Sequence, residues 1–178
     1  MRLLKNERKA FFQAFLILFL ICFQSKPAMG QGKTLITTGV GVPEFLNVGL
    51  MHQFKQIQLG LTLGTLPGAR REYYLSISGD IYWHFAGKAK FTKLKPWYGK
   101  FGLNWLGWED EIEKGRDLYL NTRVGRDFNL SENFGIKFDL GAIYALEKVR
   151  IVKKPSSSYN FFQSDVWPSL GLGLFYRL

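Results

Sequence analysis

Acid–base chemistry in this chain of 178 residues would depend on its two histidines, His52 and His84. A hydrolytic site needs a nucleophile with a base within hydrogen-bond reach. Asp80 precedes His84 by four residues, and on an extended strand that separates the two by about 13 Å, too far for contact. We therefore expect both histidines to be structural, and the sequence predicts no catalytic residue and no enzyme.

The sequence does not indicate a metal site or a reactive thiol either. The two histidines and the scattered carboxylates lack the spacing of zinc ligands. Glu109, Asp110, Glu111 and Glu113 make one segment acidic, but they do not follow the regular oxygen-ligand pattern of a calcium loop. The single cysteine, Cys22, lies in an N-terminal apolar stretch. No metal and no other cofactor is predicted.

Phosphate binding is the specific chemistry that the basic residues favour. Arginine presents a planar fork that matches phosphate oxygens, and lysine adds a point charge. The candidate contacts lie in two segments that we interpret as loops: Arg70, Arg71, Lys148, Arg150, Lys153 and Lys154. A solvated loop that binds nothing could carry the same charges, so both interpretations stay open. A second basic run (Lys88, Lys90, Lys93 and Lys95) fits a strand continuation with one wet face.

The N-terminus has the features of a cleaved secretory signal peptide. A basic region precedes an apolar stretch from Ala10 to Phe23, which is shorter than the roughly 20 residues of a membrane-spanning helix. Ala28 and Gly30 supply small residues where a signal peptidase reads, so we place cleavage before Gln31. The predicted parts are a signal peptide (1–30) and one domain (31–178). The formal net charge is +10, but without a recognised nucleic-acid-binding motif we expect no nucleic-acid partner for an exported chain.

Eight segments of alternating polar and apolar residues follow. We predict strands near 34–42, 46–54, 56–64, 73–85, 96–106, 117–127, 134–146 and 168–178. Most are about 9–13 residues long, the length at which a tilted strand crosses a bilayer. No window has sustained helical periodicity. A chain of such strands can span a membrane only as a closed barrel, because lipid cannot satisfy an open sheet edge.

The polar face of these strands carries charges of both signs. Side chains alternate across a strand, so Ile136, Phe138 and Leu140 share one face and Lys137 and Asp139 the other. In a narrow membrane barrel the polar face is internal and its charges must be paired. The predicted interior network consists of Asp80, Lys100, Arg123, Lys137, Asp139 and Arg177. Turning the four basic side chains toward lipid would cost roughly 2–4 kcal/mol each near the midplane.

A soluble barrel of the lipocalin kind has the opposite arrangement, with its apolar face inside. Aromatic residues near the predicted strand ends favour the membrane, since they match the girdles at its two interfaces. These residues are Tyr73, Trp83, Phe85, Trp97, Trp105, Trp108, Trp167 and Tyr176.

The chain ends in an apolar strand, Leu170 to Leu178. Gly173, Tyr176 and Leu178 occupy the positions that matter in the C-terminal signal of bacterial outer-membrane barrels, which this ending resembles. With its strand count and targeting segment, the mature chain resembles the small eight-stranded outer-membrane β-barrel proteins of Gram-negative bacteria. The resemblance implies an all-β, antiparallel, up-and-down transmembrane barrel in the outer membrane. It also implies insertion by the barrel assembly machinery through the last strand.

Members of that class are anchors, adhesins, surface-protection proteins, narrow channels or lipid-modifying enzymes, so the fold does not choose among them. The His-x-Ser pair of the lipid A deacylases of this size is absent. We expect a non-enzymatic role in envelope structure or in surface interaction through the outer loops. There, lipid and lipopolysaccharide phosphates would be the partners of the basic residues. The alternatives are a lipid-modifying enzyme and a narrow solute channel. The sequence does not indicate an oligomeric state.

Overall fold

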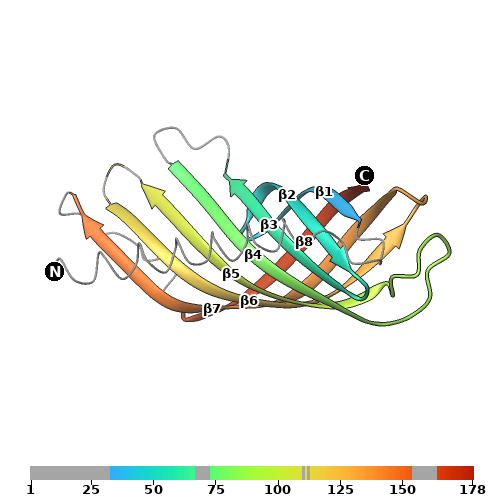
Figure 1. Cartoon of the computed structure of the whole chain (residues 1–178). Coiled ribbons are helices and arrows are strands. Elements are labelled where there is room, and N and C mark those ends of the chain that lie inside the picture. Colours follow the sequence, from blue (N-terminus) through green and yellow to red (C-terminus); the bar gives the residue numbers. More distant parts are fainter. Residues whose placement is uncertain (1–32, 67–72, 110, 112, 154–163) are drawn as a thin grey trace. The chain divides into compact units, whose positions relative to one another are not determined.

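Eight antiparallel strands form one closed barrel in which neighbours in sequence pair with each other and β1 pairs with β8 (Figure 1). The computed structural model describes residues 33–66, 73–109, 111, 113–153 and 164–178, so the predicted signal peptide lies outside the described residues. The strands are β1 (Thr34–Val42), β2 (Phe45–Phe54), β3 (Ile57–Thr65), β4 (Tyr73–Ala86), β5 (Trp97–Glu109), β6 (Glu113–Asn129), β7 (Phe134–Val152) and β8 (Val166–Arg177). The predicted fold class is confirmed.

The eight predicted strands all occur, and the largest differences lie in β6 and β7. β6 begins at Glu113 rather than at 117, and β7 ends at Val152 rather than at 146. A β-bulge leaves Leu146 without an opposite residue in β6, since Leu118 pairs with Glu147 and Tyr119 with Ala145. A bulge interrupts the alternation of polar and apolar residues. The predicted strand therefore stopped at the bulge, although β7 continues to Val152.

The barrel has two different ends. One end, which we call the terminal rim, carries both ends of the described chain, Lys33 and Leu178. It also carries the turn at Lys55–Gln56, the link 87–96 and the turn 130–133. The opposite end, the loop rim, carries the short turn at Pro43–Glu44 and the links that precede β4, β6 and β8. The link 87–96 is the long connection of the terminal rim, and the turn 43–44 is the short one of the loop rim.

The strands are unequal, so the loop rim is not level. β7 continues to Val152 although its last pair with β8 joins Tyr144 to Val166. β6 accompanies it, with Glu113 opposite Val152. In Figure 1 the long strands β4 to β7 extend to the left beyond β1, β2 and β3. One side of the barrel wall therefore stands higher than the other.

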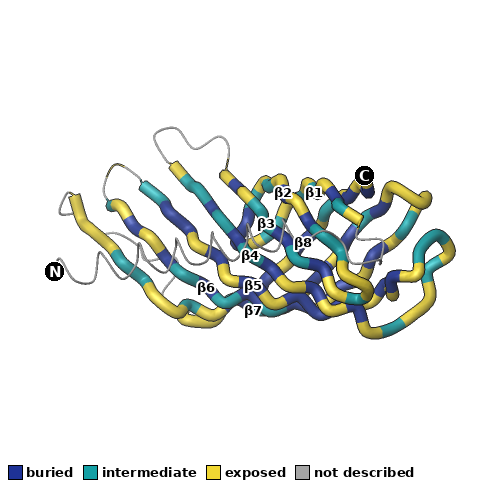
Figure 2. The backbone as a smooth tube through the Cα atoms, in the orientation of Figure 1, coloured by how far each residue is buried: buried dark blue, intermediate teal, exposed yellow. Residues whose placement is uncertain are grey.

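Burial alternates along the strands (Figure 2) and is inverted relative to a soluble protein. Lys100 and Arg123 are 4% and 5% exposed, whereas Phe101 and Leu140 are 55% and 56% exposed. An apolar surface around a charged interior is stable only when lipid covers the apolar side. The fold is therefore a transmembrane β-barrel, and the soluble alternative does not apply.

No helix within the described ranges has the length and hydropathy to cross a membrane.

Aromatic side chains gather on the outer surface near both rims, as the girdle hypothesis predicted. Those at the terminal rim include Trp83, Phe85, Trp97, Phe128, Phe134 and Tyr176, and those toward the loop rim include Tyr73, Trp105 and Tyr144. Trp108 and Trp167 were wrongly assigned to this girdle. Both pack against a buried cluster of Leu106, Tyr119 and Ile143 inside the barrel.

Candidate functional site: a charged plug in the barrel interior

The centre of the barrel is filled by charged side chains that contact one another. Of the six residues predicted for the interior network, four meet here: Asp80, Lys100, Arg123 and Asp139. They come from β4, β5, β6 and β7, each on the inward register of its strand. A fifth residue, Glu44, joins them. We call these five residues the central charge cluster.

Glu44 lies in the turn between β1 and β2 and reaches into the barrel, where it is 2% exposed. It accepts hydrogen bonds from Lys100 Nζ at 2.7 Å, from Arg123 Nη2 at 2.5 Å and from Asn121 Nδ2 at 3.0 Å. The sequence prediction missed it because it belongs to no strand. The available signal was the charge balance, since four basic residues had been assigned to the interior against Asp80 and Asp139, with Asp127 near one end.

The two cations hold the Glu44 carboxylate in its charged form. Burial opposes ionisation, but the nearby Lys100 and Arg123 outweigh it and lower the pKa of Glu44 from 4.5 to about 2. A buried carboxylate with two cationic partners is ionised at neutral pH. The turn that carries Glu44 is therefore anchored to β5 and β6.

Arg123 connects the turn to the rest of the wall. Its Nη1 donates to Asp139 Oδ1 at 2.9 Å, and its Nη2 donates to the carbonyl oxygen of Val42 at 2.6 Å. Its Nε donates to Ser169 Oγ at 2.5 Å and to Asn121 Oδ1 at 3.1 Å. One guanidinium therefore contacts groups at the end of β1 and in β6, β7 and β8.

Lys100 lies between two acids of the cluster, Glu44 and Asp80. Its ammonium lies 3.4 Å from Asp80 Oδ1, in addition to the Glu44 contact. Asp80 also accepts from Ser78 Oγ at 2.7 Å. Buried charges need both a counter-ion and hydrogen bonds to offset desolvation, and the central charge cluster supplies both.

Glycines provide the space that the long charged side chains occupy. A Cβ atom on Gly102 would collide with Asp80 Oδ1, and one on Gly171 would collide with Asp139 Oδ1 and Arg123 Nη1. Both glycines lie on the inward face, and the absence of a side chain at these two positions leaves room for Asp80, Asp139 and Arg123.

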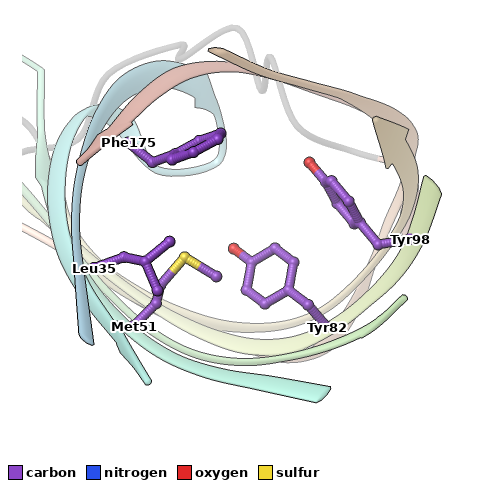
Figure 3. Packing of buried hydrophobic residues seen from close by; sticks show 5 residues of the cluster. All are labelled: Leu35, Met51, Tyr82, Tyr98 and Phe175. Carbon is purple, nitrogen blue, oxygen red and sulfur yellow. The ribbon is translucent and has the colours of Figure 1, made fainter. Parts of the chain in front are cut away.

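An apolar layer closes the interior between the central charge cluster and the terminal rim. Figure 3 shows its members pointing inward from opposite walls: Leu35, Met51, Tyr82, Tyr98 and Phe175. Lys137 lies in this layer, with its ammonium 4.3 Å from the centroid of the Tyr82 ring and 3.8 Å from Asp127 Oδ1. Arg177 lies at the rim itself and donates to Asn129 Oδ1 at 2.5 Å. These two predicted network residues therefore lie outside the central charge cluster.

The loop-rim side has a second cap, formed by Leu106, Tyr119 and Ile143 with Phe45, Trp108, Ala145 and Trp167 packed against them. Asp117 is buried beside it and accepts from Tyr119 Oη at 3.0 Å. Between the caps, a cavity of about 50 Å³ touches the central charge cluster. That volume suits a few water molecules.

Both histidines have structural partners. His84 is 1% exposed, with Nε2 3.1 Å from Gln58 Oε1 and Nδ1 2.6 Å from the carbonyl oxygen of Lys95. His52 lies on the outward face near the terminal rim, and its Nδ1 is 3.1 Å from Thr34 Oγ1. Within the described residues, no group of three or more potential ligands could hold a metal ion.

The basic residues predicted to bind anionic lipid are engaged within the protein where the structure describes them. Lys148 pairs with Asp165 at 3.0 Å, and Lys153 pairs with Glu109 at 2.8 Å. The guanidinium of Arg150 lies 5.9 Å from the ring centroid of Trp108. Arg70, Arg71 and Lys154 lie outside the described residues.

The acidic segment before β6 is partly neutralised in the same way, since Glu109 also lies 3.2 Å from Lys114. Asp110 lies outside the described residues.

The predicted assembly signal lies in the strand that closes the barrel. Gly173 pairs with Gly39 and Tyr176 with Ile36 in β1, while Tyr176 also pairs with Phe134 in β7. The amide nitrogen of Leu178 donates to the carbonyl oxygen of Thr34 at 2.9 Å. The last residues are therefore part of the wall.

No family model matches the chain, and no curated protein does. Among solved structures, the chain is similar to CarO2 of Acinetobacter baumannii, with 12% identity and a TM-score of 0.50 over 84% of this chain and 100% of that one. CarO of the same bacterium (12% identity, covering 86% of this chain and 100% of that one) has a TM-score of 0.47. A major outer membrane protein from Thermus thermophilus (15% identity, 84% and 100% covered) also reaches 0.47. These two scores are too low for structural inference.

The likeness to CarO2 shows a shared fold and nothing about ligand or activity. The chain is a membrane β-barrel of eight strands, and its resemblance to the small outer-membrane barrels is confirmed at the level of the fold. Its distinguishing feature is an interior filled by the central charge cluster between two apolar layers.

Proposed function

We propose that this protein is a non-enzymatic barrel of the outer membrane with a structural or surface-interaction role in the cell envelope. The observation that carries the proposal is the filled interior, in which Glu44, Lys100 and Arg123 bridge the walls. A barrel that is bonded across its interior is rigid and does not conduct, so its function would reside on its surface.

The unequal strands favour the loop rim as that surface. β7 projects beyond its last pair with β8, and β4, β5, β6 and β7 stay paired with one another up to the loop rim, so they present a sheet on one side. Basic residues carried there, including Lys148 and Arg150, would lie near lipopolysaccharide phosphates. Arg70, Arg71 and Lys154 would join them from the neighbouring links. The orientation follows the usual placement of short turns inward and longer loops outward.

Export and assembly belong to the same proposal. Residues 1–30 would direct the chain across the inner membrane and be removed. Gly173, Tyr176 and Leu178 would present the last strand to the barrel assembly machinery. Lipid is the partner that the apolar exterior supports, and nucleic acid is not an expected one.

Fractionation with heat-modifiability tests the location. The full chain is expressed in a Gram-negative host, and its outer membranes are analysed on a gel with and without boiling. We expect recovery in the outer membrane with a heat-dependent shift in mobility. Recovery as a soluble periplasmic protein would contradict the proposal.

Planar-bilayer recording tests the filled interior. We expect no single-channel steps from the purified folded protein at neutral pH. Reproducible steps in the unmodified protein would instead support the narrow-channel alternative.

A further inference from the structure

A hollow of about 300 Å³ lies at the terminal rim, between the link 87–96 and the end of β6. This is the end of the barrel at the right of Figure 1, where the green link runs. Lys88, Lys90 and Arg126 line the hollow together with two apolar residues, Phe128 and Leu130, that are 45% and 56% exposed. The hollow therefore combines positive charge with an apolar border.

Arg126 occupies a position where charge is unfavourable without a partner. It lies on the outward face of β6, opposite Trp97 in β5 and Phe138 in β7. Its outward neighbours along β6 are Val124 and Phe128. An arginine on the lipid face costs roughly 2–4 kcal/mol at the midplane and about 0–1 kcal/mol near an interface. Arg126 lies next to the terminal rim, at the depth of the lipid headgroups. A headgroup there could accept hydrogen bonds from its guanidinium.

Two aromatic rings hold the guanidinium in place. It lies 5.4 Å from the ring centroid of Trp97 and 5.1 Å from that of Phe128. Such contacts leave the edge of the guanidinium, with its N–H donors, free to meet an anion. Lys90 is arranged in a similar way, with its ammonium 5.2 Å from the ring centroid of Phe91.

The three basic side chains of the hollow have no acidic partner among the described residues. In the part of the chain that the structure describes, no carboxylate lies within 4.0 Å of Lys88, Lys90 or Arg126. Asp127 lines the hollow, but its side chain is 2% exposed and lies 3.8 Å from Lys137, inside the barrel.

At the loop rim, three of the described lysines have acidic neighbours. Lys114 and Lys153 pair with Glu109, and Lys148 pairs with Asp165. Within the described residues, Lys88, Lys90 and Arg126 thus form a group of basic side chains at the terminal rim that lacks such pairing, with Arg126 on the outward face of β6.

We propose that this hollow binds the phosphate headgroup of an anionic phospholipid in the leaflet at the terminal rim. Arg126 receives the phosphate with its paired N–H donors, and Lys88 and Lys90 contribute charge from the link. The acyl chains run from Arg126 toward the middle of the barrel wall, along the exposed Val124 and Leu140. The site rests on the proposed membrane location, but it requires neither a closed interior nor a role for the loop rim.

The test is lipid retention by the folded protein. The full-length protein is purified from membranes in detergent, offered equal amounts of phosphatidylglycerol and phosphatidylcholine, and examined by native mass spectrometry. The test variant is Lys88→Gln/Lys90→Gln/Arg126→Gln. The matched control, Lys33→Gln/Lys55→Gln/Lys93→Gln, removes the same charge from the same end of the barrel but from outside the hollow. Heat-modifiability verifies that each variant is folded.

The wild-type protein should retain phosphatidylglycerol preferentially, and the test variant should lose about tenfold or more of that preference, since each basic residue near an anionic surface adds severalfold. The control should keep most of it. Equal retention of the two lipids by the wild type, or an equal loss in the control, would overturn the proposal. Displacement of the retained lipid by millimolar inorganic phosphate would likewise contradict a lipid site. Single-channel conductance would bear only on the proposed function, whereas recovery as a soluble protein would remove the membrane location on which both proposals rest.

Discussion

The Glu44 carboxylate accepts a hydrogen bond from the Lys100 ammonium at 2.7 Å across 56 positions of sequence, and it does so from a turn rather than from a strand. The contact places an acidic residue of the loop rim at the centre of the barrel. It also joins the first hairpin to the far wall, so that Glu44 neutralises charge and links the strands at the same time.

Replacing Glu44 by alanine should destabilise the barrel by roughly 3–5 kcal/mol, because Lys100 and Arg123 would stay buried with fewer counter-ions. The measurement is the free energy of unfolding in urea, in lipid vesicles. Glu132→Ala is the control, since that side chain is exposed at the terminal rim. Similar values for both variants would mean that Glu44 does not hold the interior together.

Acid should weaken the barrel through the same residue. The pKa of Glu44 is lowered from 4.5 to about 2 in the folded protein. Its stabilisation is therefore fully present above about pH 4.5 and is lost as the pH falls toward 2, a contribution of roughly 3 kcal/mol. Unfolding free energies of the wild type and Glu44→Gln, measured between pH 2 and 6, should converge as the pH falls. Parallel curves would contradict this.

Gly141→Ala should destabilise the protein by about 1–3 kcal/mol, the usual effect of overpacking. An added Cβ atom would collide with the carbonyl oxygen of Thr122, a backbone group that cannot turn away. Gly99→Ala is the matched control, because its nearest neighbour would be Phe101 Cε2 at an ordinary 3.5 Å. The measurement is the denaturant midpoint of each variant in the same detergent. Equal midpoints would show that the backbone around Gly141 shifts to accommodate the added Cβ atom.

Arginine substitutions should report the membrane depth of the outer face. Leu140→Arg, in the middle of β7, should cost roughly 2–4 kcal/mol, and Ile57→Arg, beside the turn at the terminal rim, about 0–1 kcal/mol. Both leucine and isoleucine are exposed on the outside, at 56% and 44%. Folding titrations into lipid vesicles measure the difference. If water rather than lipid covered this face, both variants would be nearly neutral.

The strands and their faces were predictable because the alternation of residues such as Lys137, Phe138 and Asp139 encodes them directly. The link to Glu44 was not, since nothing in the local pattern of a two-residue turn tells whether it points into the barrel or into solvent. The end of β7 was hidden by the bulge at Leu146. Trp108 was misplaced because an aromatic residue near a strand end suits a girdle and an internal cap equally well.

The hydrogen bonds of Arg123 also depend on how the barrel closes. This one side chain donates hydrogen bonds to Val42 at the end of the first strand, Asp139 in the seventh strand and Ser169 in the last. Bringing together groups so distant in sequence costs loop-closure entropy. All three hydrogen bonds can form only when the first and last strands have paired in the correct register. A barrel closed in another register would bury charged side chains without their partners. A correctly aligned barrel therefore satisfies its buried charges, whereas a misaligned one would bury them without partners and be less stable.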